Sequence, residues 1–212
     1  MTFSSVNAAT GVRVIATKFW IGVEHLSVDA LLQAAAHPAP IFCGHLGACE
    51  AARQAVAIAS RSPDWPGGNT EWHDARTSTT IGRGLVLDLL RQRCPIEEIT
   101  LVLPTWEWGS GREGERHPVS AEWSDIREVL DGLLAVARGA AAVLEASRGA
   151  GMTVLAPQNH PQPHAVQAGL SAFVEEFVAV ESQKWIARGL FLRLGRHRWV
   201  DDSLASAHKR NT

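Results

Sequence analysis

The stretch Ile99-Thr100-Leu101-Val102-Leu103 is the clearest β-strand signal in the sequence, because it is a short, continuous apolar run. Outward from it, apolar strand-like runs alternate with helix-like segments in both directions. Six strands with intervening helices predict an α/β fold with a doubly wound parallel sheet. The expected strands are 12–17, 40–43, 71–73, 99–103, 152–155 and 190–194. The expected helices are 28–36, 47–60, 80–93, 122–148 and 164–186.

The composition predicts one domain that covers residues 1–212, with a core at about 12–194 and a tail at 195–212. The 212 residues are 46% hydrophobic and 20% charged, and the formal net charge is -2. This charge gives no basic face for nucleic acid or for an anionic membrane. The sequence lacks a signal-peptide pattern and a long apolar run, and its three cysteines are widely spaced. We therefore expect a cytoplasmic protein with no metal site and with no nucleic-acid or membrane partner.

The segment Thr17-Lys18-Phe19-Trp20-Ile21-Gly22-Val23-Glu24 is expected to form the turn between the first strand and the first helix. A nucleotide-binding protein places a glycine-rich loop there, because a pyrophosphate needs close approach to bare backbone N–H groups. This segment has one glycine, and Lys18, Trp20 and Ile21 add bulk. The carboxylate of Glu24 would repel a phosphate by about 4 kcal/mol at about 4 Å and an effective dielectric of about 20. We therefore expect the chain to bind no cofactor.

Three segments of the second half carry a family resemblance. The first runs from Ala121-Glu122-Trp123-Ser124-Asp125-Ile126 through Ala140-Ala141-Ala142-Val143-Leu144 to Gly149-Ala150-Gly151-Met152-Thr153-Val154-Leu155. The others are Ala168-Gly169-Leu170-Ser171-Ala172-Phe173-Val174 and Ala187-Arg188-Gly189-Leu190-Phe191-Leu192. They resemble the region of the fourth to sixth strands in the short-chain dehydrogenase/reductase family, which implies a Rossmann-like fold. No apolar run after Leu194 matches the family's last helix and strand, so we expect a fold truncated at its C-terminus.

The resemblance also implies where cofactor-binding and catalytic groups would lie, and this chain has other residues there. Of the family's Thr-Gly-x-x-x-Gly-x-Gly turn it keeps Thr17 and Gly22, with Lys18 and Glu24 at the other glycines. The family's Asn-Asn-Ala-Gly after the fourth strand is matched by Leu103-Pro104-Thr105-Trp106. The Trp106 ring is expected to block the path of the cofactor ribose.

The family's catalytic positions are lost in the same alignment. The asparagine falls on Gly132, the serine on Pro157 or Gln158, and the Tyr-x-x-x-Lys pair on Pro163 and Gln167. The chain has no tyrosine at all. Hydride transfer in this family needs a phenol activated by a nearby lysine, and proline and glutamine supply neither group. We therefore expect this chain not to catalyse the hydride transfer of short-chain dehydrogenases.

These losses favour a non-catalytic subunit that pairs with a complete short-chain dehydrogenase through its two long helices. The resemblance implies an NAD(P)-dependent alcohol or hydroxyacyl-CoA dehydrogenase as the partner, which would carry the NAD(P) in a heteromeric complex. The apolar residues of these two helices could instead face only the chain's own sheet. The expected interface residues are Ile126, Val129, Leu130, Leu133, Ala137, Ala141, Leu144, Leu170, Phe173 and Phe177.

Two further hypotheses remain open. His160 and His164 lie near the lost serine and tyrosine, so they could act as acid or base in a rebuilt, nicotinamide-independent site, or they could cap the next helix. The chain could also be a homodimer that binds a ligand in a remodelled cleft. Four tryptophans are expected to fill the space that the cofactor would leave: Trp65, Trp72, Trp106 and Trp108.

Overall fold

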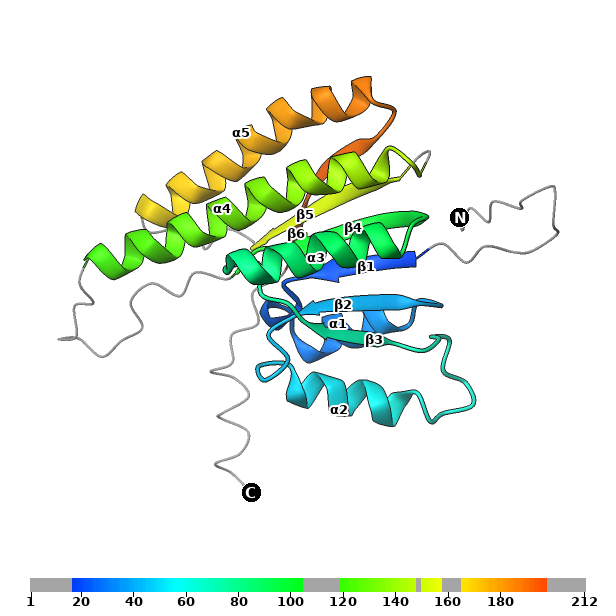
Figure 1. Ribbon diagram of the computed structural model, residues 1–212. Helices are drawn as coiled ribbons and strands as arrows, with labels where there is room; N and C mark the ends of the chain where they lie inside the picture. The colour runs from blue at the N-terminus through cyan, green and yellow to red at the C-terminus, as the bar shows by residue number, and fades with distance from the viewer. Residues whose placement is uncertain (1–16, 105–118, 148–149, 158–164, 198–212) are drawn as a thin grey trace.

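The computed structural model describes residues 17–104, 119–147, 150–157 and 165–197, and gives only the backbone of 119–126, 129 and 165–167. These residues form a six-stranded sheet in the order β3-β2-β1-β4-β5-β6 (Figure 1). All neighbouring strands are parallel. The α/β, doubly wound class predicted from the sequence is therefore confirmed. The strands are β1 (Thr17–Ile21), β2 (Pro40–Gly44), β3 (Glu71–Asp74), β4 (Ile96–Val102), β5 (Gly151–Pro157) and β6 (Phe191–His197).

Helices cover both faces of this sheet (Figure 1). One face carries α1 (Val28–Ala35) and α2 (Glu50–Ala59), which contact each other. The other face carries α3 (Thr80–Gln92), α4 (Val119–Leu144) and α5 (Ala165–Ala187), and α3 packs against α4. A short 3-10 turn, η1 (Val23–His25), joins β1 to α1. Within the described part of the chain, no helix combines the length and the apolar character needed to cross a membrane.

Two apolar clusters lie on the two faces of the sheet. Phe19 and Ile21 of β1 belong to the cluster beneath α3, α4 and α5, together with Ile99 and Met152. Phe42 belongs to the cluster beneath α1 and α2. Successive side chains of a strand point to opposite faces, so β1 and β2 contribute to both clusters: Trp20 and Phe42 lie on the α1–α2 side, and their neighbours lie on the other side. This two-sided burial explains why the strand signals are nearly continuous apolar runs.

The first strand extends further along the chain than the sequence analysis expects, because it ends at Ile21. Thr17–Ile21 is β1, and Phe19 and Ile21 are fully buried while Lys18 and Trp20 face the other side. Its register pairs Lys18 with Pro40 and Phe19 with Ile41. The interpretation of 17–24 as the turn was therefore wrong for its first five residues. Residues 12–16 lie outside the described part of the chain.

Candidate functional site

The candidate site is a cavity of about 320 Å³ at the carboxyl ends of β1 and β4. The strand order reverses between these two strands, and open α/β sheets bind ligands at such a switch point. The cavity is lined by η1, the loop from β3 to α3, the end of β4 and α4. The lining residues are Glu24, His25, Thr77, Ser78, Leu101, Val102, Leu103, Pro104, Glu128 and Leu133.

The turn after β1 depends on Gly22. Its backbone is left-handed, with φ 77° and ψ 34°, and a Cβ there would lie 2.5 Å from the carbonyl oxygen of Val102. Because β1 ends at Ile21, Gly22 is the first glycine of the turn pattern, and Leu26 and Val28 stand at the other two positions. The register with Lys18 and Glu24 at glycine positions was wrong, although two of the three glycines are still replaced.

Lys18 has a structural role instead. It lies in β1, and its Nζ is 3.5 Å from Oε2 of Glu98 on the neighbouring β4. Glu98 also accepts a hydrogen bond from the Thr153 hydroxyl at 2.9 Å and pairs with Arg193 at 3.2 Å. Lys18 therefore belongs to a polar network across four strands and does not reach the turn.

The start of α1 does not fit a dinucleotide pyrophosphate. Ser27 caps the helix by accepting a hydrogen bond from the Ala30 N–H at 3.2 Å, and Asp29 lies in the first turn. The side chain of Glu24 extends to the end of β2, where a Cβ on Gly44 would lie 2.1 Å from its Oε2. This oxygen is buried and has no hydrogen-bond partner among the described residues. A phosphate here would meet two carboxylates and a helix end with one donor already used.

Two histidines from distant parts of the sequence lie at this edge of the sheet, close enough for His197 to affect the pKa of His25. Nε2 of His25 lies 3.9 Å from Oε1 of Glu24, and Nε2 of His197 donates to the carbonyl oxygen of Leu103 at 3.2 Å. Burial lowers the pKa of His25, the Glu24 carboxylate opposes this shift, and His197 lowers the pKa further. His25 is therefore neutral near pH 7 and could accept a proton. The sequence analysis missed both residues, because no motif marks them.

The positions aligned with the family's catalytic residues have packing roles where they are described. Gly132 lies in α4, and a Cβ there would come within 3.0 Å of the Thr77 carbonyl oxygen, so α4 packs closely against the β3–α3 loop. Pro157 is buried at the end of β5, and its carbonyl accepts a hydrogen bond from Arg196 at 3.1 Å. Gln167 lies in α5, but its side chain is not described. Outside the described residues are Trp106, Trp108, Gln158, His160, Pro163 and His164.

Arg196 of β6 holds the end of β5 against α5. It donates to the Ser171 hydroxyl at 3.2 Å as well as to Pro157, and it forms an ion pair with Glu175. The sequence analysis gives this residue no role in the fold. Its role arises because β6 and α5 become neighbours only in the fold.

The tryptophan and cysteine positions also lie away from the cleft. Trp65 and Trp72 pack on the cluster beneath α1 and α2, so the expectation that they fill a vacated cofactor space was wrong. Burial is the main cause that raises the pKa of the Cys43 thiol to about 12 and of the Cys49 thiol to about 11. Both are therefore protonated near pH 7. No group of three or more metal-ligating side chains occurs within the described ranges.

Most of the expected interface residues of α4 are not available to a partner. Leu133, Ala137, Ala141 and Leu144 are buried in the chain's own core, so their assignment to an interface was wrong. These residues lie on the side of α4 that packs on the sheet and on α3, where they cover apolar side chains of the strands. Leu130 is half-buried, and the side chains of Ile126 and Val129 are not described.

The outer side of α5 is different. Leu170 is buried, but Phe173 is 41% exposed and Phe177 half-buried, and their rings stack with centroids 6.4 Å apart. Val180 is 47% exposed and Ile186 is 67% exposed. The apolar residues of α5 therefore face both the core and the outside. We call Phe173, Phe177 and Val180 the α5 apolar stripe.

Comparison with solved structures gives the class of fold. An NADPH-dependent reductase involved in bacilysin biosynthesis, YwfH, has a TM-score of 0.69 and 10% identity, covering 93% of this chain and 81% of its own. The NADPH-bound short-chain oxidoreductase of Pseudomonas aeruginosa PAO1 with an atypical catalytic centre has a TM-score of 0.67 and 13% identity, covering 92% and 76%. A 3-oxoacyl (acyl-carrier-protein) reductase of Agrobacterium tumefaciens C58 with NADP bound has a TM-score of 0.63 and 15% identity, covering 92% and 75%.

These likenesses show that the chain has the Rossmann-like fold of short-chain oxidoreductases. No family model matches the sequence, and no curated protein sequence matches it either. At 10 to 15% identity the likeness concerns the fold and not the activity.

Proposed function

We propose that this chain is a non-catalytic subunit that pairs with and stabilises a complete NAD(P)-dependent alcohol or hydroxyacyl-CoA dehydrogenase of the same fold. The observation that carries the proposal is the α5 apolar stripe, in which Phe173 and Val180 are exposed and Phe177 is half-buried against the chain's own core. The NAD(P) would be held by the partner, and this chain would contribute a helical docking face.

The stripe has the spacing and chemistry of a helix contact. Phe173, Phe177 and Val180 stand at positions i, i+4 and i+7, which places them on one side of α5. Large apolar side chains that lie together on a surface mark interaction sites, because burial of their area is favourable by about 25 cal/mol per Å². A helix with apolar residues on two sides is expected to be covered on both. The fold covers one side, and a partner would cover the other.

The cleft supports the non-catalytic part of the proposal. Leu26 and Val28 replace glycines of the turn, and Glu24 and Asp29 bring negative charge to the start of α1. The absence of tyrosine from the sequence removes the family's acid. A partner with a complete glycine-rich turn would bind the cofactor, and its Tyr-x-x-x-Lys pair would transfer the proton.

Two alternative functions remain to be tested: a rebuilt catalytic site and a ligand-binding homodimer. A rebuilt site at His160 and His164 stays a prediction, and an unchanged turnover in a His164→Ala variant would exclude it. A second copy of this chain could also bury the α5 apolar stripe, which would make the protein a homodimer with a ligand-binding cleft.

The deciding experiment is affinity capture of the tagged chain from its native host, with light scattering and mass spectrometry of the eluted complex. We expect a short-chain dehydrogenase with complete motifs at equal stoichiometry. Phe173→Glu should abolish its recovery, because a carboxylate in the stripe would be buried without a partner. Ile81→Glu, on the exposed side of α3, is the matched control and should leave recovery unchanged.

Titration of the isolated chain with NADPH completes the test, and we expect no saturable binding. A monomer that captures no dehydrogenase would contradict the pairing, and a homodimer would favour the ligand-binding alternative. Saturation with NADPH at micromolar concentration would instead indicate an ordinary reductase.

A further inference from the structure

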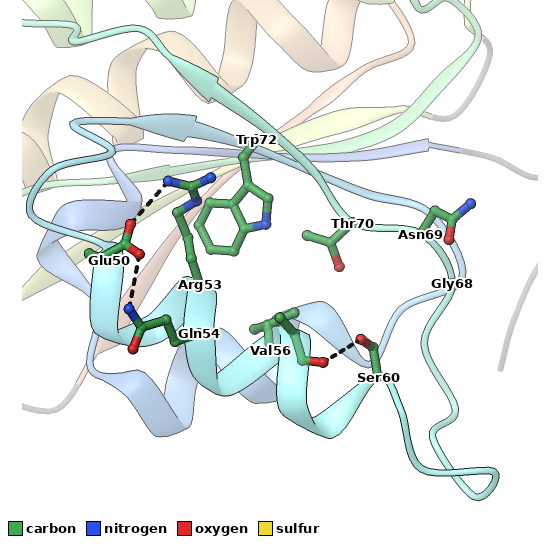
Figure 2. Close-up of a pocket in the computed structure, with 10 residues that line it drawn as sticks. Glu50, Arg53, Gln54, Val56, Ser60, Gly68, Asn69, Thr70 and Trp72 are labelled. Atoms are coloured by element: carbon green, nitrogen blue, oxygen red, sulfur yellow. Dashed lines mark hydrogen bonds and ion pairs between the residues drawn. The ribbon is translucent and has the colours of Figure 1, made fainter.

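A second pocket lies at the outer edge of the sheet, away from the cleft between β1 and β4. Its volume is about 500 Å³, within the range of roughly 300–1,000 Å³ typical of small-molecule sites. Figure 2 shows that Arg53 of α2 extends toward Trp72, and that Val56 of α2 and Ser60 just after it line the side opposite Thr70 and Trp72, which belong to the segment that leads into and forms β3. We call this the α2–β3 pocket.

The wall on the β3 side is held rigidly by the rest of the fold. The Gly68 N–H donates to the carbonyl of His37 at 3.1 Å, and a Cβ at Gly68 would lie 1.7 Å from the Pro38 carbonyl oxygen. Trp72 packs edge-on against Phe42, with ring centroids 4.6 Å apart. The pocket is therefore formed before any ligand binds, which lowers the entropic cost of binding.

The charges in the pocket are already paired with each other. Nη1 of Arg53 donates to Oε2 of Glu50 at 3.2 Å, and Nε2 of Gln54 donates to Oε1 of Glu50 at 3.0 Å (Figure 2). The guanidinium carbon of Arg53 lies 6.0 Å from the centroid of the Trp72 ring. Nε of Arg53 is buried and has no hydrogen-bond partner within the described residues. The lining thus carries no net charge, because Glu50 and Arg53 balance each other. It also offers the Trp72 ring and the Nε–H donor of Arg53, which is unpaired among the described residues.

We infer that the α2–β3 pocket binds a neutral, hydroxylated ring compound, such as a single sugar unit. An anion would meet Glu50, a cation would meet Arg53, and either would have to separate the pair. Hydroxyl groups donate and accept, so they can bond to Glu50, Arg53, Gln54 and Thr70 while the pair stays intact. The apolar C–H face of the ring would pack against the indole of Trp72 and the side chain of Val56.

The test is a titration of the ¹⁵N-labelled chain with methyl β-D-glucopyranoside, followed through the indole N–H signals of its eight tryptophans. The Trp72 signal is assigned with Trp72→Phe. We expect this signal to shift in a saturable way, with a dissociation constant of about 1 mM, as is usual for a small polar ligand. Arg53→Ala should weaken binding at least about tenfold, because charge-assisted hydrogen bonds to the ligand are lost.

Arg91→Ala is the matched control, because Arg91 forms an i,i+3 ion pair with Asp88 on α3, as Arg53 does with Glu50 on α2. It should leave the dissociation constant unchanged. The inference is overturned if the glucoside gives no saturable shift up to about 100 mM, or if Arg53→Ala binds as well as the wild type. Tighter binding of glucuronate or glucosamine would overturn it too, as would binding only of an extended peptide along β3, the edge strand of the described sheet.

Discussion

Gly22 is the residue whose backbone shapes the candidate site. Its φ is 77°, and a Cβ on this residue would lie 2.5 Å from the Val102 carbonyl oxygen, so the chain can turn here only without a side chain. We expect Gly22→Ala to lower the free energy of unfolding by about 2–4 kcal/mol, because left-handed strain and a backbone clash add together. Urea denaturation of the purified variant measures this loss.

The control for that substitution is Gly84→Ala. Gly84 lies in α3, and a Cβ there meets no atom within 4 Å. The free energy of unfolding should rise by about 0.5–1 kcal/mol, since alanine favours the helix and has less freedom in the unfolded chain. Equal effects of the two substitutions would show that the turn does not require glycine.

His25 gives the fold a dependence on pH. Its pKa in the folded chain lies below the ordinary value of 6.5, mainly because of burial. The unfolded chain therefore binds the proton first, and stability falls as the pH drops below about 6.5 toward the folded pKa. Urea midpoints at about pH 7.5 and about pH 5.5 should differ less in His25→Gln than in the wild type. His37, whose pKa is also lowered by burial, keeps part of the dependence in the variant. An unchanged difference would contradict the role of His25.

At the scale of elements, the sequence analysis expected both α4 and α5 to contact a partner. In the structure α4 packs in the core, and among the described side chains of the two helices only α5 has large apolar residues that are exposed. Leu133 of α4 is 1% exposed and belongs to the core, whereas Phe173 of α5 is on the surface. Leu133→Ala should cost about 2–5 kcal/mol of unfolding free energy, and Phe173→Ala below about 1 kcal/mol. Thermal and urea denaturation of both variants measures the difference. A larger loss for Phe173→Ala would place this ring in the chain's own core and weaken the pairing proposal.

The sequence predicts the elements better than their edges and faces. The helices at 80–93 and 122–148 are found close to the expected positions because their apolar residues recur at helical spacing. The strand at 99–103 is found close to its expected position because it is a continuous apolar run. The end of the first strand was expected at residue 17 and lies at Ile21, because Lys18 interrupts the apolar run and the next residues were assigned to the turn. In the sheet Lys18 and Trp20 alternate with Phe19 and Ile21 on the opposite face.

At the scale of the whole molecule, the strand order decides what the cleft contains. The β1–β4 switch point brings together η1, the β3–α3 loop and α4, and with them the carboxylates of Glu24 and Glu128. A cleft that held an anionic dinucleotide would need the opposite charge at this place. The α5 apolar stripe and the α2–β3 pocket lie on opposite faces of the sheet, so substitutions in one should not affect the other.

The sequence by itself determined the alternation of strands and helices and the chemistry that this chain lacks. A missing tyrosine or glycine is missing in every conformation, and the apolar period of a segment is a local property. Only the tertiary structure decided which apolar side of α4 or α5 is covered, that His197 affects the pKa of His25, and that Trp72 lines a pocket with Arg53. These outcomes depend on packing between segments far apart in the chain, and local periodicity does not encode such packing.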